Sequence, residues 1–350
     1  MEEVPCLIKG PNILVAAPFP PGKLPAEPLA HLLARYGRAD PRLVIGPRPG
    51  EDVAVIDMGE RYLVAKSDPV TFATDEIGRY AVNVNANDIA CSGATPRWFL
   101  ATLLLPEGKT DIQMVESIFA QIAQACDELG VTLAGGHTEI TYGLERPIVV
   151  GHMLGEVARQ HLVVTSGVQA GDDILLTKRI AVEATAIIAR EKAEELRDVF
   201  DAAMLKRCRE FLRRPGISVV RDAQVALAAG RVHAMHDPTE GGLATGLWEM
   251  AQAAGVGLVV EEAAIPIWPE TSALCAHFGL APLGMIASGS LLIACPPADT
   301  PRILQALTEA SIPAARIGGA VEASAGCQLQ TPQGTRPLPT FARDEIARLF

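Results

Sequence analysis

Asp88 lies in the middle of a helical pattern of apolar residues, where a carboxylate is unexpected. From Thr74 to Pro96, apolar residues recur every three or four positions, at Ile77, Tyr80, Ala81, Val84 and Cys91. A buried ionised carboxylate is costly unless a cation or hydrogen-bond donors compensate it. Three asparagines, which are poor helix formers, surround it at positions 83, 85 and 87. Asp88 therefore binds a cation, or it is satisfied by backbone amides or an arginine.

Asp52 and Asp68 add two carboxylates in the same half of the chain. Asp52 stands at the entrance of an expected strand over 53–56. Asp68, followed by Pro69, is expected to end a strand over 62–67, which is a usual place for site residues in α/β folds. Oxygen ligands drawn from several loops suit Mg²⁺, which bridges protein carboxylates to substrate phosphates. We predict that Asp52, Asp68 and Asp88 bind Mg²⁺; the alternative is that they are turn caps and surface charges.

Two glycine-bearing motifs are each expected to leave a strand. The first is Gly135-Gly136-His137-Thr138-Glu139, after a short strand over 131–134, where glycines allow close backbone approach or positive φ. The second runs from His236 through Asp237 to Gly241-Gly242, ahead of a helix over 243–254. Free amides and the helix dipole favour phosphate at such a turn. Alternatively, His137 is a structural hydrogen-bonding residue, and Asp237 before Pro238 simply begins a turn.

Several common sites are excluded by their motifs. Gly241 to Gly246 has the glycine spacing of a Walker P-loop, but Leu247-Trp248 follows instead of Lys-Ser/Thr. The sequence has no G-x-G-x-x-G after a first strand, no H-E-x-x-H and no G-x-S-x-G. Dinucleotide, zinc-protease and serine-hydrolase sites are therefore not expected.

Strands and helices alternate in both halves, which predicts an α/β (α+β) protein. A chain of 350 residues exceeds the usual size of one core, so we predict two domains, 1–158 and 159–350. Thr110 with Gln113 resembles a capping box, and the helix behind it is expected to bury Ile112 and Phe119. Lys23, in a proline-rich arm, is expected to be a solvated turn residue.

Composition limits the class of partner and the compartment. The net charge of −11 argues against nucleic acid and suits a protein that binds divalent cations. Seven scattered cysteines without a C-x-x-C pair predict reduced thiols, and the acidic N-terminus does not resemble a signal peptide, so a cytoplasmic protein is expected. Residues 278–298 carry no charge, but prolines and glycines interrupt them, which favours buried core over a membrane span.

Five segments in this order resemble the AIR synthase superfamily, and most of all its HypE-like branch of hydrogenase-maturation proteins. These segments are GEDVAVID (50–57), NDIACSGATP (87–96), AGGHTE (134–139), GDDILLTK (171–178) and DPTEGGLATGLWEMA (237–251). The resemblance implies two α/β domains and a homodimer whose N-terminal domains share a β-barrel. It also implies ATP and Mg²⁺ near that interface, and ATP-dependent activation of an unidentified amide-, carbamoyl- or phosphate-type acceptor, either a small molecule or a partner protein.

The resemblance also implies roles for individual residues. Asp52, Asp68 and Asp88 would hold Mg²⁺, and His137 and Asp237 would be catalytic. The remaining positions would contact the nucleotide or its phosphates: Asn87, Gly135, Gly136, Thr138, Gly241 and Gly242. Such a site needs positioning and charge neutralisation rather than a protein nucleophile. The alternatives are a nucleotide-binding assembly factor with little turnover, and a kinase or selenophosphate synthase-like activity.

The chain departs from these relatives at two places. HypE ends in a tail with a terminal cysteine, whereas this sequence ends at Phe350 and its last cysteine is Cys327, in an expected strand. Self-modification as in HypE is therefore not expected. Histidine at position 137, where family members often carry Asp or Glu, resembles the selenophosphate branch, but Cys6 lacks the glycine-rich setting of that branch.

Overall fold

The first half of the chain forms a six-stranded sheet that is mostly antiparallel. The computed structural model describes residues 19, 22, 24–47, 51–71 and 75–350. The strand order is β1-β2-β3-β6-β4-β5, and β4 and β5 run parallel. The strands span Leu43–Ile45 (β1), Ala54–Asp57 (β2), Arg61–Val70 (β3), Thr95–Pro106 (β4), Thr132–Thr141 (β5) and Ile148–Ala158 (β6). A short helix, α1, precedes them at Ala26–Tyr36.

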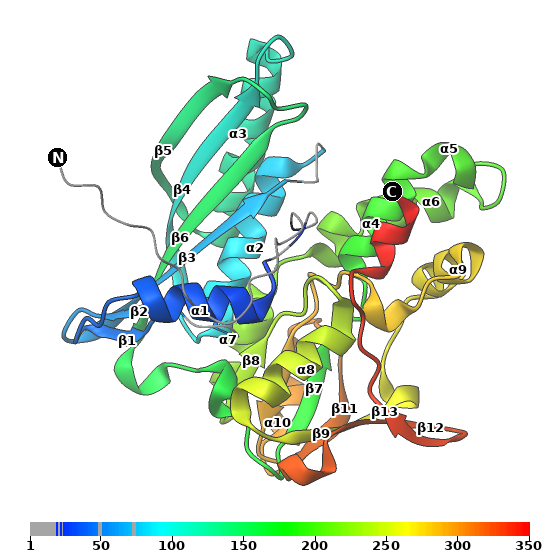
Figure 1. Cartoon of the computed structure of the whole chain (residues 1–350). Helices are drawn as coiled ribbons and strands as arrows, with labels where there is room; N and C mark the ends of the chain where they lie inside the picture. Colours follow the sequence, from blue (N-terminus) through cyan, green and yellow to red (C-terminus); the bar gives the residue numbers. More distant parts are fainter. Residues whose placement is uncertain (1–18, 20–21, 23, 48–50, 72–74) are drawn as a thin grey trace, which may run out of the picture.

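The second half forms a seven-stranded sheet in the order β13-β12-β9-β11-β7-β10-β8. Its strands span Asp173–Thr177 (β7), Ala234–His236 (β8), Gly257–Glu261 (β9), Leu292–Cys295 (β10), Ala314–Val321 (β11), Cys327–Thr331 (β12) and Gly334–Pro337 (β13). Its helices span Val182–Glu191 (α4), Ala193–Leu196 (α5), Ala202–Glu210 (α6), Val220–Ala229 (α7), Gly242–Ala254 (α8), Pro269–Phe278 (α9) and Thr300–Glu309 (α10). The mixed α/β class with two sheets is confirmed (Figure 1).

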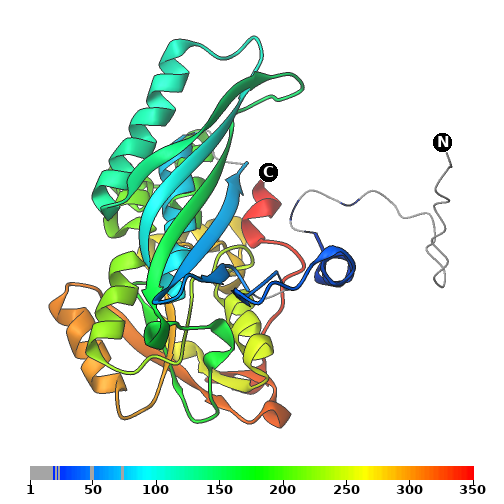
Figure 2. The same ribbon diagram turned by 90° about the vertical axis from the view of Figure 1, so that its left-hand side faces the viewer.

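Helix α2 (Ile77–Cys91) is the central element of the first half. It packs on β3, β4 and β6 and against α3 (Ile112–Leu129), whose length runs beside the long strands (Figure 2). A Cβ atom at Gly151 of β6 would collide with Asn85, and one at Gly155 would collide with Ile89, so these two glycines let the helix lie directly on the strand. The predicted helix is therefore present but shorter, because Pro96 already belongs to β4; Thr74 lies outside the described residues.

Asp88 is buried, as the apolar pattern around it predicts, but burial extends beyond that pattern to nearly all sides of α2. Thirteen of its fifteen residues are buried, Arg79 and three asparagines included. The second half covers the side that the sheet leaves open, since α7 and β8 both contact α2. Figure 1 shows these two elements next to α2, where the two sheets meet. The asparagines of the helix therefore make hydrogen bonds in the interior and do not form a solvent-exposed face.

Three local expectations are also wrong. Asp111, not Thr110, caps α3, because its carboxylate accepts a hydrogen bond from Met114 N (2.8 Å). Ile112 is 71% exposed and Phe119 is 40% exposed instead of buried. Strand β3 continues past Asp68 and Pro69 to Val70, so Asp68 lies inside a strand and not at its end.

Asn87 links the two halves through its amide group. Its Nδ2 donates to Ile217 O (2.9 Å), and its Oδ1 accepts from Val219 N (2.9 Å), just before α7 begins. A hydrophobic core extends across the same junction, since buried residues such as Val64 and Ile293 belong to one cluster. The halves therefore meet in an ordered interior.

The uncharged stretch 278–298 forms turns and strand β10, and most of its residues are buried. Within the described residues, no helix has the length and apolar character required to cross a membrane.

We expect Asn87→Ala to lower the free energy of unfolding by about 2–4 kcal/mol, because two buried backbone groups lose their partners. Denaturant unfolding followed by tryptophan fluorescence measures this loss. Asn83→Ala is the matched control, since its side chain donates only to Arg79 O within its own helix (2.9 Å). Equal losses in the two variants would show that Asn87 does not hold the halves together.

Candidate functional site

The three predicted acids converge, and they converge on Lys66. The Nζ atom of Lys66 lies 3.0 Å from Asp88 Oδ2, 3.3 Å from Asp68 Oδ2 and 4.0 Å from Asp52 Oδ1. The lysine side chain is only 10% exposed. Asp88 is buried, whereas the side chains of Asp52 and Asp68 are 41% and 43% exposed. A nearly buried ammonium held against three carboxylates is an unusual arrangement, because lysine normally carries its charge to water.

The local backbone explains why these groups meet. Lys66 and Asp68 are two residues apart on β3, so both side chains point to the same face of the sheet. Asn85 of α2 accepts a hydrogen bond from Asp68 N (2.9 Å), and it donates to Ala81 O within its own helix (2.8 Å). This bond fixes α2 to β3, and Asp88, one turn further along the helix, comes to lie over Lys66.

The second half of the chain contributes Asp237 and His236 at the end of β8. Asp237 is buried and accepts a hydrogen bond from the thiol of Cys91, the last residue of α2 (3.4 Å). His236 Nδ1 lies 3.7 Å from Asp52 Oδ2, and its Nε2 lies 2.9 Å from Glu249 Oε2 on α8. The acidic cluster, as we call Asp52, Asp68, Asp88 and Asp237, therefore spans the junction between the halves.

The charges of the acidic cluster are only partly balanced. Burial lowers the pKa of Lys66, but the charges of Asp88, Asp68 and Asp52 together raise it by more than burial lowers it. The net pKa is above the usual value for lysine, so the amine stays protonated. Burial raises the pKa of Asp88 well above its usual value; Lys66 opposes that shift, and Asp237, Asp52 and Asp68 add to it. Burial therefore favours the protonated form of a carboxyl group in the cluster, at Asp88 and at Asp237.

Asp237 and Cys91 show the same imbalance. Burial raises the pKa of Asp237 to about 6 although His236 opposes the shift. Burial, and then Asp237 and Asp88, raise the pKa of the Cys91 thiol, which disfavours the thiolate that a nucleophile requires. Asp237 can exchange a proton near neutral pH, whereas Cys91 cannot be expected to attack a substrate.

The acids do not form an open cage for a resident Mg²⁺. Magnesium needs close oxygen ligands around a free centre, and here Lys66 fills the space between Asp52, Asp68 and Asp88. Among the described residues, no group of three or more His, Cys, Asp or Glu side chains is arranged to hold a metal ion. A cavity of about 20 Å³ borders Asp52, Asp88, Cys91 and His236, which is room for about one water molecule.

The predicted loop 135–139 is part of an edge strand and lies away from the acidic cluster. Gly136, Ala101, Gly151 and Asp68 pair in one row across β5, β4, β6 and β3. Three strand spacings of about 4.8 Å put Gly136 roughly 14 Å from Asp68. His137 and Thr138 are exposed beside it, and His137 Nε2 lies 3.4 Å from Glu139 Oε2. Within one chain, His137 cannot act on the same atom as Asp237.

One of the two glycines of this strand, Gly136, serves close backbone approach, as expected. A Cβ atom at Gly136 would collide with the backbone of Ala101 on β4, whereas nothing lies near one at Gly135. Both glycines have positive φ, 151° and 148°.

Asn87, Gly241 and Gly242 have their polar groups engaged by the chain itself. The amide of Asn87 bonds to residues 217 and 219 and is fully buried. Gly241 N donates to Asp344 Oδ2 (2.8 Å), and Gly242 N donates to Thr239 O (3.0 Å). A phosphate at this turn would have to replace Asp344, a carboxylate that already shows that the turn accepts an anion.

Sequence reasoning missed Lys66, His236 and Cys91 as members of the site. Lys66 stands two residues before Asp68, which is the strand spacing that brings side chains to one face, so that spacing was the available signal. His236 precedes Asp237 directly, and Cys91 ends the helix that carries Asp88. Only the fold shows that these three residues face the acids.

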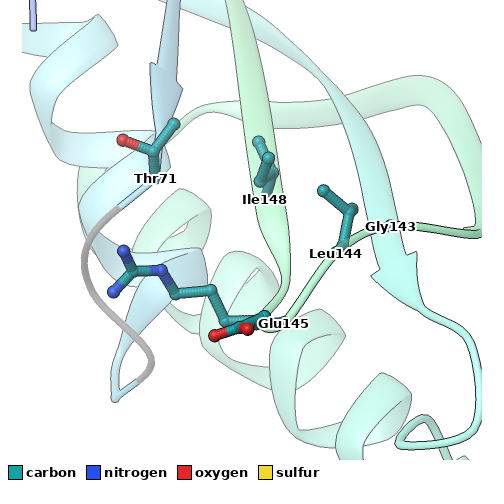
Figure 3. A pocket seen from close by; sticks show the side chains of 6 residues that line it. Thr71, Gly143, Leu144, Glu145 and Ile148 are labelled. Atoms are coloured by element: carbon teal, nitrogen blue, oxygen red, sulfur yellow. The ribbon is translucent and has the colours of Figure 1, made fainter. Parts of the chain in front are cut away.

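A larger opening of about 330 Å³ lies beyond the acidic cluster. It is lined by Thr71, Gly143, Leu144, Glu145, Arg146 and Ile148. Figure 3 shows Thr71, which directly follows β3, near Ile148 at the start of β6, with Leu144 and Glu145 on the connection ahead of β6. Its lining contains none of the four clustered acids.

Family models match both halves of the chain. The model for "AIR synthase related protein, N-terminal domain" covers residues 50–157, and the C-terminal domain model covers residues 169–328. The chain belongs to the AIR synthase related family. Its relatives include a Methanocaldococcus jannaschii protein named for hydrogenase expression/formation, 30% identical over 87% of this chain and 90% of that protein. The carbamoyl dehydratase HypE of Cupriavidus necator is 31% identical over 79% and 78%.

The fold of this AIR synthase related protein is that of solved HypE structures. The crystal structure of the hydrogenase maturation protein HypE in complex with ATP superposes with a TM-score of 0.70. It covers 91% of each chain, at 24% identity. The two relatives at 30% and 31% identity, named for hydrogenase expression/formation and HypE, confirm the HypE-like branch expected from the five sequence segments.

Asp237 makes the protein less stable as pH rises from about 4 to about 6. Its pKa is raised from 3.8 to about 6 by burial, so the folded state binds more protons than the unfolded state in that range. This rise in the pKa of Asp237 corresponds to a loss of about 3 kcal/mol in the free energy of unfolding as the pH increases through this range. We expect Asp237→Asn to gain stability relative to the native chain over this interval, as measured by urea unfolding at several pH values. Exposed Asp198→Asn is the control, and a difference that does not change with pH would contradict the assignment.

Proposed function

We propose that this protein is an ATP-dependent enzyme that activates an amide- or carbamoyl-type acceptor. The observation that carries the proposal is the acidic cluster, with its buried lysine, at the junction of the two halves of a HypE-like chain. The relative from Cupriavidus necator is named a carbamoyl dehydratase, and a HypE of the same fold was solved with ATP. Both names support a nucleotide and a carbamoyl group as the substrate classes.

The reaction we propose is a phosphoryl transfer followed by loss of phosphate. The acceptor oxygen attacks the γ-phosphorus of ATP, the bond to the bridging oxygen breaks, and ADP leaves. The nitrogen then gives one proton to a base, which leaves a phosphorylated imidate with a carbon–nitrogen double bond. Breaking its carbon–oxygen bond would release phosphate, and loss of the second nitrogen proton to a base would leave a carbon–nitrogen triple bond. Phosphoryl transfer depends on positioning and charge neutralisation. Mg²⁺ enters this proposal as the counter-ion that ATP brings, since the acids as arranged do not form a cage for it.

The residues of the acidic cluster suit the proton steps. Asp237, whose pKa burial raises to about 6, is mostly deprotonated at neutral pH and has a pKa close to it, which suits a general base. Lys66 and His236 supply positive charge on the two sides of Asp52. The roles proposed for Asn87, Gly241 and Gly242 at the nucleotide require the chain to release their present partners.

ATP with Mg²⁺ should raise the melting temperature of the native chain, and Asp88→Asn should abolish that rise while leaving the fold intact. The reason is that Asp88 lies at the centre of the cluster, 3.0 Å from Lys66. Differential scanning fluorimetry and circular dichroism measure the two effects. Asp127→Asn, an exposed acid on α3, is the matched control. An unchanged shift in Asp88→Asn would place the nucleotide elsewhere.

A nucleotide-binding assembly factor with little turnover is the second candidate. It is favoured by the hydrogen bond from Gly241 N to Asp344 Oδ2, because a phosphate was expected to accept from that amide. ADP release separates the two functions: release that rises on addition of a carbamoyl compound such as carbamoyl phosphate supports the enzyme. Tight ATP binding without turnover, with or without a maturation partner protein, supports the factor.

We also propose that the chain works as a homodimer through β5. This strand is a sheet edge that pairs only with β4 among the described strands, and its residues are largely exposed, Ile140 by 60%. Exposed edges of this kind readily pair with another chain. Within one chain, residues 135–138 of β5 lie away from the acidic cluster. Pairing at β5 would bring them next to a second copy of the chain, where they would contribute to a shared site.

Ile140→Glu should shift the native chain from dimer to monomer, because it places a charge in the proposed apolar contact. Size-exclusion chromatography with light scattering measures the mass. Val199→Glu, which changes a 50% exposed residue of the second half, is the control and should leave the mass unchanged. A dimer that withstands Ile140→Glu would exclude this edge as the interface.

A further inference from the structure

We propose that the ammonium group of Lys66 takes the place of a divalent cation between Asp52, Asp68 and Asp88. The native cluster would then bind no metal ion of its own, and loss of the amine would create a site for Mg²⁺ or Mn²⁺. This inference concerns the acidic cluster on which the proposed function also rests, but it makes no use of a nucleotide. It assigns Lys66 the role of a built-in cation.

The first argument is where the amine lies. Its three carboxylate partners come from separate parts of the first half: the segment before β2, strand β3 and helix α2. A lysine that only packed against the sheet would carry its charge to solvent. The side chain of Lys66 is instead 10% exposed, and its Nζ is nearest to Asp88, an acid that is itself 9% exposed. The chain therefore places this amine where three anions converge.

The second argument is that an ion and the amine cannot share this space. Magnesium binds oxygen at about 2.1 Å and keeps an octahedral shell. The oxygens that would bind the ion are Asp88 Oδ2 and Asp68 Oδ2. Lys66 Nζ already lies 3.0 Å from the first and 3.3 Å from the second. The neighbouring cavity of about 20 Å³ accommodates about one water molecule and not a hydrated ion.

The third argument is charge. Asp237 of the second half adds a fourth carboxylate, and His236, whose charge opposes the rise in the pKa of Asp237, also lies beside Asp52 and Glu249. If the amine were absent, the acids would repel one another, and a hard divalent cation with oxygen ligands would be the group best suited to replace it.

Titration of the full-length chain with Mn²⁺ in the absence of nucleotide tests the proposal. Free Mn²⁺ is counted from its electron paramagnetic resonance signal. The native chain should show no stoichiometric site, and Lys66→Ala should gain one, about tenfold or more tighter than any native binding. Lys66→Arg keeps the charge and should gain none. The double variant Lys66→Ala/Asp88→Asn should lose the new site.

Two results would overturn the proposal. One is a stoichiometric Mn²⁺ site in the native chain that Asp88→Asn removes, because amine and ion would then coexist. The other is a folded Lys66→Ala that binds no more Mn²⁺ than the native chain. If Lys66→Ala is unstable, its melting temperature should rise with Mn²⁺ more than that of the native chain, and an equal rise in the two would also refute it. ATP binding is measured separately, so a failure to bind ATP would not change the interpretation of the Mn²⁺ titrations.

Discussion

The burial of one ammonium among four carboxylates is the constraint on which the rest of this structure depends. A buried charge without a partner costs several kcal/mol, so Lys66 and Asp88 must stay together once either is inside. This pair requires β3 and α2 to keep a fixed separation, and the contact of Cys91 with Asp237 extends the requirement to the second half. The cluster therefore connects β3, α2 and the end of β8 through polar contacts.

The asparagines of α2 show how the chain satisfies this constraint. Asn83 bonds within its own helix, Asn85 fixes the helix to β3, and Asn87 fixes it to the segment ahead of α7. Each amide lies inside the protein, where its hydrogen bonds compensate for the low helix propensity of asparagine. Gly151 removes the Cβ that would keep Asn85 away from the sheet. The unusual composition of this helix is thus explained by packing, without any contact to a ligand.

Much of the fold could be predicted, and the failures have physical causes. The helix around Asp88 and the strands flanking it follow from periodicity, and the convergence of Asp52, Asp68 and Asp88 was expected from their positions in the first half. The prediction of a loop at Gly135-Gly136 was wrong because two glycines are typical of a turn. Here both lie within β5, and Gly136 allows β5 to approach β4 closely. Lys66 was missed because local patterning cannot show that a lysine on a strand faces a helix that is packed against it. Strand β11 and helix α9, whose signals are weak, were not predicted either.

The position of the acidic cluster, rather than the motifs alone, decides which residues can work together. Asp237 reaches the three acids only because β8 ends beside α2, although 149 positions separate it from Asp88 in the chain. His137 is closer in sequence, yet two strands of the same sheet lie between it and Asp68. Strands β4 and β6 are paired along most of their length, so no small movement of β5 can bring His137 to Asp237 within one chain. Within one chain, His137 therefore lies apart from the acidic cluster, whose charged neighbours are Lys66 and His236.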